Sequence, residues 1–124
     1  MPAANYNLVA EQGSSYNKTL TVRDTTDALM DLTGYTARMH VRERYSAEAK
    51  LIDLTTENGG ISLGGALGTI SLSISAASLA EIAVPDQPGT PPSRACVYDL
   101  ELVFGAAVTR LLQGKFTIYR EVTR

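Results

Sequence analysis

Apolar and polar residues alternate with a period of two along most of this sequence, and that period restricts the fold to one built from β-strands. In the run GTISLSIS (68–75), Ile70, Leu72 and Ile74 alternate with three serines, so the apolar side chains share one face of an extended strand. One polar face is typical of a sheet with one side in water. Runs with the same alternation are 16–22, 37–44, 98–102 and 116–121, and shorter candidates are 6–12, 50–55, 108–113 and a very short strand within 57–68.

One segment departs from this period. Ala77, Leu79, Ala80 and Ile82 have helical spacing, which predicts a short helix near 76–83 with Ser75 or Ser78 as its N-cap. The segment 84–94 holds four of the five prolines. Proline cannot donate to a sheet's hydrogen bonds, so we expect an exposed, proline-rich loop there.

Seven to eight short strands with one brief helix predict an all-β fold, a two-sheet antiparallel Ig-like β-sandwich. A length of 124 residues fits one domain, residues 1–124. The core candidates near the C-terminus are Leu100, Leu102, Leu111, Phe116 and Ile118. Tyr98 is expected to bury its ring and to anchor a loop through its hydroxyl group.

Composition narrows the classes of function. A net charge of −2 argues against a dedicated nucleic-acid binder, which usually carries a basic surface. A single cysteine excludes an intrachain disulfide and a cysteine-rich metal site. The N-terminus has no signal-peptide pattern and no run approaches the ~18 apolar residues of a membrane helix. We therefore expect a protein made in the cytoplasm, with no membrane partner, no metal and no cofactor.

No constellation of catalytic residues is visible, and we expect a protein that is not an enzyme. The one cysteine, Cys96, and the one histidine, His40, fall in different predicted strands. Cys96 has the same parity as Tyr98 and Leu100, so a buried thiol is favoured over a Cys–His pair. Asp24, Asp27 and Asp31 lie in one loop, where solvated turn residues are favoured over ligands of a hard cation.

The sequence RMHVRER places four basic side chains on one face of the predicted strand 37–44. Side chains on one face repeat every ~6.6–6.8 Å, so the stripe would be ~20 Å long. The basic residues of this candidate interface are Arg38, His40, Arg42 and Arg44.

Two interpretations of this stripe remain open. It is either a docking surface for an acidic partner protein, an anionic glycan or a nucleic acid, or a solvated face. In the second case, Asp99 and Glu101 of a neighbouring strand would supply cross-strand partners. The proline-rich loop is likewise either a stiff connector or a pre-ordered arm that meets a neighbouring subunit through Pro88, Pro91 and Pro92.

Three segments together resemble a family of small structural proteins of tailed bacteriophages. They are MDLTGYTARMHVRER (30–44), GGISLGGALGTISLSISAASLAEI (59–82) and YDLELVFGAAVTRLLQGKFTIYREVTR (98–124). The pattern includes an Asp-Leu-Thr-Gly element, an arginine-bearing strand, a Gly-Thr-Ile strand with an alanine-rich helix, and a closing hairpin. The resemblance extends to the Ig-like N-terminal module of baseplate proteins that hold receptor-binding proteins, and it covers roughly residues 6–124.

The resemblance implies a non-enzymatic virion protein that acts through protein–protein contacts. The first expectation is a tail, neck or baseplate adaptor that anchors other tail components and forms a homo-oligomer in the particle. The alternatives are a capsid decoration protein of the same fold and a glycan-binding module. Within the motif Asp31-Leu32-Thr33-Gly34, the residues predict a turn that leads into the arginine strand, with Gly34 in a conformation that other residues resist.

Overall fold

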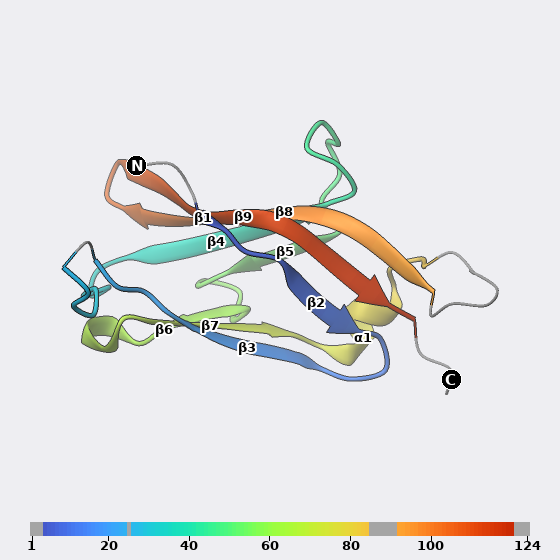
Figure 1. Ribbon diagram of the computed structural model, residues 1–124, viewed down its shortest axis with the longest axis horizontal. Helices are drawn as coiled ribbons and strands as arrows, with labels where there is room; N and C mark the ends of the chain where they lie inside the picture. Colours follow the sequence, from blue (N-terminus) through green and yellow to red (C-terminus); the bar gives the residue numbers. More distant parts are fainter. Residues whose placement is uncertain (1–3, 25, 85–91, 121–124) are drawn as a thin grey trace.

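The chain folds as a β-sandwich of two sheets, which confirms the predicted fold class (Figure 1). The computed structural model describes residues 4–24, 26–84 and 92–120. The strands of this part of the chain are β1 (Ala4–Asn5), β2 (Leu8–Glu11), β3 (Tyr16–Thr21), β4 (Thr36–Arg42), β5 (Ile52–Thr55), β6 (Ile61–Leu63), β7 (Thr69–Ile74), β8 (Ser93–Phe104) and β9 (Ala107–Tyr119).

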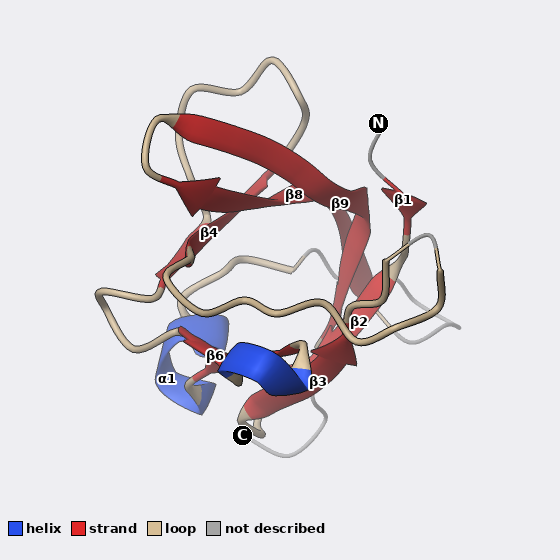
Figure 2. Cartoon of the chain, turned by 90° about the vertical axis from the view of Figure 1, so that its left-hand side faces the viewer, coloured by secondary structure: helices blue, strands red, loops and turns tan. Residues whose placement is uncertain are grey.

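The larger sheet is built around the long β8–β9 hairpin. Its strand order is β1-β9-β8-β4-β5, with β2 also paired to β9, while β3-β7-β6 form the smaller sheet. Figure 2, turned by 90°, shows β4, β8 and β9 in one layer and β3 and β6 in the other. Alternating side chains of both sheets fill the space between the layers, as the period of two requires.

Two details of strand pairing differ from the prediction. β1 and β2 pair parallel to β9, whereas we expected antiparallel sheets throughout. The separate strands predicted at 108–113 and 116–121 are one strand, β9, which continues through Gly114. Period-two patterns identify the face of each side chain, but they carry no information on which strand lies alongside or in which direction it runs.

A β-bulge interrupts the β8–β9 ladder. Leu100 is opposite Leu112 and Glu101 is opposite Arg110, so Leu111 is the extra residue. The predicted core position of Leu111 is therefore only half correct, because its side chain is partly buried and packs at the rim of the core. The other predicted core residues are buried: Leu100, Leu102, Phe116 and Ile118, together with Cys96 and Tyr98.

Phe116 occupies the centre of an aromatic group within this core. Its ring meets Tyr16 edge-on with centroids 5.6 Å apart, and Tyr98 in the same manner at 6.4 Å. Edge-to-face packing is a favourable geometry for aromatic pairs. The aromatic group joins β3 of the smaller sheet to β8 and β9 of the larger one.

The α-helix α1 (Ala76–Ala80) is shorter than the predicted 76–83. Ser75 is its N-cap, because the side chain of Ser75 accepts a hydrogen bond from the backbone N–H of Ser78 at 3.1 Å. At the other end, Gln12 Nε2 donates to the carbonyl oxygens of Leu79 and Ile82 at 2.8 and 2.7 Å. The helix thus ends where a side chain from the β2–β3 turn takes up its last carbonyl groups.

The Asp31–Gly34 segment forms the predicted turn. The backbone N–H and the hydroxyl of Thr33 donate to Asp31 at 2.9 and 2.6 Å, and the N–H of Tyr35 donates to the carbonyl of Leu32 at 3.0 Å. Leu32 is buried and Gly34 has a φ of 84°, a conformation that favours glycine. The motif therefore fixes the entry into β4.

Only part of the proline-rich loop lies within the described residues. Pro88 and Pro91 lie outside the described residues. Pro92 is half-buried, and its carbonyl accepts a hydrogen bond from the N–H of Arg120. β8 begins at Ser93, so the predicted loop boundary of 84–94 extends two residues into a strand.

Candidate functional site

The basic stripe is shorter than predicted. Arg38, His40 and Arg42 point to the outer face of the larger sheet, and Met39 and Val41 between them are buried. Arg44 lies beyond the strand, because β4 ends at Arg42 and the chain turns away into the loop that precedes β5. The side chain of Arg44 instead lies 3.4 Å from Glu43.

Carboxylates lie beside two residues of this stripe, Arg38 and His40. Arg38 Nε lies 2.7 Å from Glu101 Oε1, which is the cross-strand pair expected of a solvated face. His40 Nε2 lies 3.3 Å from Asp53 on β5. Asp99 lies opposite His40 in the β4–β8 ladder, and its carboxylate pairs at 3.6 Å with Arg110 on β9. The outer face is a mixed-charge surface rather than a cationic one.

Arg42 has a structural partner on the loop that follows it. Its guanidinium donates hydrogen bonds to the carbonyl oxygens of Ala47, at 3.0 Å, and of Glu48. These bonds fold the 43–50 loop back toward β4. Arg42 is therefore committed to holding a loop and is less available to a partner.

Replacing Arg42 with alanine is expected to lower the free energy of unfolding by about 1–2 kcal/mol, because two carbonyl groups lose a charged donor. Amide hydrogen exchange in residues 43–50 should accelerate. Arg38→Ala is the matched control, since its exposed ion pair contributes less than about 1 kcal/mol. Chemical denaturation of both variants checks this, and an equal or larger loss for Arg38→Ala would contradict it.

The other chemistry-bearing residues have structural roles. Cys96 is buried in the core, whereas His40 faces outward, so the two do not pair. Burial raises the pKa of the Cys96 thiol above its ordinary value. Hydrogen bonds from Thr26 and Thr33 hold the pKa values of Asp24 and Asp31, respectively, below the ordinary range. Both carboxylates act as acceptors that shape turns, as the loop composition indicated.

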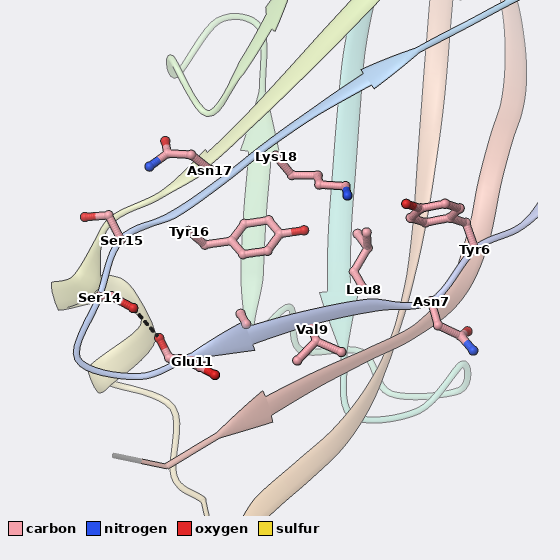
Figure 3. A pocket seen from close by; sticks show the side chains of 11 residues that line it. Tyr6, Asn7, Leu8, Val9, Glu11, Ser14, Ser15, Tyr16, Asn17 and Lys18 are labelled. Atoms are coloured by element: carbon pink, nitrogen blue, oxygen red, sulfur yellow. Dashed lines mark hydrogen bonds between the residues drawn. The ribbon is translucent and has the colours of Figure 1, made fainter. Parts of the chain in front are cut away.

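The open side of the sandwich carries a groove that the sequence did not reveal. Two consecutive strands border this groove: β2 lies at the edge of the larger sheet and β3 at the edge of the smaller one. The two strands diverge from the turn that connects them (Figure 1). Between them lies a cavity of about 490 Å³, lined by residues from Tyr6 to Glu11 and from Ser14 to Lys18. Figure 3 shows Tyr16 and Lys18 directed toward Leu8 and Tyr6, and Asn17 directed away.

A second cavity, of about 440 Å³, continues the first along β3. Tyr6 and Lys18 line both cavities, so the two cavities lie next to each other. The lining here is more apolar and includes side chains that reach the core but are only partly covered: Leu20, Val22, Leu111 and Leu112. We call the combined depression the β2–β3 groove.

The wall of the groove nearest β9 is held by an internal hydrogen bond. The hydroxyl of the buried Tyr98 donates to the carbonyl oxygen of Tyr6 at 2.5 Å, which confirms the predicted anchoring role of Tyr98. The N–H of Tyr6 donates to Gln113 on β9 at 2.9 Å. On the opposite wall, burial raises the pKa of Tyr16 to about 12, so its hydroxyl stays protonated at neutral pH.

Lys18 is the charged group at the middle of the groove. Its ammonium nitrogen lies 5.7 Å from the centre of the Tyr6 ring, within the range of a cation–π contact. None of the ion pairs found among the described residues includes Lys18. The only sequence signal for this site is Lys18 itself, which shares one parity with Tyr16, Leu20 and Val22 and so interrupts an otherwise apolar face.

Comparisons with known proteins leave the family open. None of the protein-family models matches the chain, and a search of curated proteins gave no significant match. Within residues 4–24, 26–84 and 92–120, no helix has the length and apolarity needed to cross a membrane. Over the same ranges, no three His, Cys, Asp or Glu side chains gather as a metal site.

Proposed function

We propose that the protein is a structural component of a tailed-bacteriophage virion, a tail, neck or baseplate adaptor that joins other tail components through protein–protein contacts. Its partners are other phage structural proteins and further copies of itself. The single observation that carries the proposal is the β2–β3 groove. One edge strand of each sheet borders this groove, and partly buried core side chains line it. Such an edge is a recognised route of assembly.

The motifs that resemble phage structural proteins also support the proposal. The Asp31–Gly34 segment is a turn that launches β4, and the closing segment is the β8–β9 hairpin. These motifs have structural roles within the fold. The groove is therefore the surface that we expect a partner to contact. The basic stripe contributes less, because Arg38 and His40 each lie beside a carboxylate and Arg42 is bonded to loop carbonyl groups.

Quantitative mass spectrometry of purified particles of the phage that encodes the chain tests this role. The expected result is the protein in particles at roughly a dozen copies, as a symmetric tail assembly requires. A copy number in the hundreds would replace the adaptor with capsid decoration. Detection in infected-cell lysate but never in particles would overturn the virion proposal, and the glycan-binding alternative would then be tested on a glycan array.

A further inference from the structure

We propose that the free edge of β3 accepts an extended strand from a partner protein, and that this strand carries apolar residues at alternate positions and an acidic residue opposite Lys18. The inference rests on the proposed role in assembly, and it adds the chemistry of the partner and the place where it binds. The occupant is a strand because the vacant position lies at a sheet edge, beside a groove with an apolar lining.

The strand order shows which position is vacant. In an Ig sandwich the first strand lies beside the second, in a sheet of strands A, B, E and D. In this protein β1 and β2 both pair with β9 of the larger sheet, and within residues 4–24, 26–84 and 92–120 β3 pairs with β7 alone. No described strand therefore fills the place beside the six residues of β3 that a first strand would take.

The backbone groups available at this edge follow from the ladder on the other side. The N–H of Val22 donates to Gly68, next to the start of β7, at 2.7 Å. Because the direction alternates along an antiparallel strand, Leu20 and Lys18 also bond toward β7. Asn17, Thr19 and Thr21 then present their backbone N–H and C=O groups to the open edge. The backbone groups of these three residues are spaced to form a regular ladder of hydrogen bonds with an incoming strand.

The groove selects the side chains of the incoming strand. A strand paired with β3 would place alternate side chains over Leu20, Val22, Leu111 and Leu112, which are partly buried, and would cover them. Lys18 has no carboxylate partner among the described residues, whereas Arg23, at one end of the groove, is already paired with Asp27 at 4.0 Å. Glu11 lies at the other end, near the β2–β3 turn. An acidic residue at the middle of the strand would therefore neutralise Lys18.

A second copy of this chain fits the edge less well. Two β3 strands paired about a two-fold axis would place both Lys18 ammonium groups on the same face of the joined sheet. Like charges on neighbouring strands are destabilising, and an inward-facing lysine on an edge strand is a known device against self-pairing. The charge of Lys18 thus favours an acidic partner over self-association.

The probe for this site is a seven-residue peptide of alternating threonine and leucine with a glutamate at its centre. NMR titration of the full chain is expected to show saturable binding at millimolar peptide, with amide shifts centred on β3. The amides of Asn17, Thr19 and Thr21 should gain protection from hydrogen exchange. Shifts spread over the surface without protection at β3, or no binding at all, would overturn the proposal.

Two variants separate strand addition from other modes of binding. Thr19→Pro removes an N–H that faces the open edge and spares the ladder with β7, so it should fold and abolish binding. Lys18→Glu should weaken binding of the glutamate peptide roughly fivefold and improve binding of the same peptide with a central lysine. Lys115→Glu, the same charge change at an exposed position of β9 outside the groove, should alter neither. Equal effects of both charge reversals would overturn the role of Lys18, even if Thr19→Pro fails to fold.

Measuring whether the variants are incorporated into particles distinguishes failure of this inference from failure of the proposed function. If Thr19→Pro and Lys18→Glu proteins enter particles as the unchanged protein does, β3 is not the docking edge and the virion role stands. If the peptide binds as expected but the protein is never found in particles, the edge accepts strands and the virion role is wrong.

Discussion

Replacing Phe116 with alanine is expected to lower the free energy of unfolding by about 3–5 kcal/mol. Domains of this kind are usually stable by about 5–15 kcal/mol, so the variant should lose a large share of its stability. The ring of Phe116 is fully buried and contacts Tyr16 and Tyr98 edge-on. Its removal leaves a cavity where the two sheets meet, and Tyr98 cannot move into it without breaking its hydrogen bond to Tyr6.

The other phenylalanine supplies a matched control. Phe104 lies at the end of β8, is 52% exposed, and touches Tyr35 with ring centroids 4.9 Å apart. Phe104→Ala should cost about 1 kcal/mol, because it removes one surface contact and no core packing. Urea denaturation of the two variants measures the difference. Equal losses would mean that the sheets are not held together at Phe116.

The sequence was informative wherever side-chain polarity follows the face of a strand. The alternation in 68–75 and 37–44 placed Ile70, Leu72, Met39 and Val41 in the core, where the structure has them. The helix near Leu79 and the Asp31–Gly34 turn were recognisable because capping and turn residues act on their immediate neighbours. These elements depend on interactions between residues that are close in the sequence, so local sequence patterns were sufficient to predict them.

Pairing between distant strands was not recoverable in the same way. The period of two placed Asp99 and Arg38 on the same face of the sheet. The bulge at Leu111 shifts the register of β9, and Arg110 on β9 is the ion-pair partner of Asp99. The β2–β3 groove depends on β2 joining β9, a contact more than 100 residues away along the chain. Apart from Lys18, no residue of β3 indicates that its second edge is unpaired, because pairing depends on strands that are distant in the sequence.

Gly114→Ala is expected to detach the N-terminal segment from β9. A Cβ atom at position 114 would lie 2.5 Å from the carbonyl oxygen of Tyr6 and 3.0 Å from the side-chain oxygen of Asn7. The backbone of Tyr6 must therefore move, at a cost of about 1–3 kcal/mol. Hydrogen exchange should accelerate at the amides of Tyr6 and Lys115, whose acceptors are Gln113 and Asn7.

Gly59→Ala tests whether this effect is local. Gly59 has a φ of 83° with no atom within 4 Å of an added Cβ, so alanine there costs about 1–2 kcal/mol through backbone strain alone. The two variants thus have similar stability and differ in where exchange rises. Because Tyr6 forms one wall of the β2–β3 groove, Gly114→Ala should also weaken binding of the glutamate peptide, whereas Gly59→Ala should not. Unchanged peptide binding in Gly114→Ala would show that the β3 edge acts without the N-terminal wall.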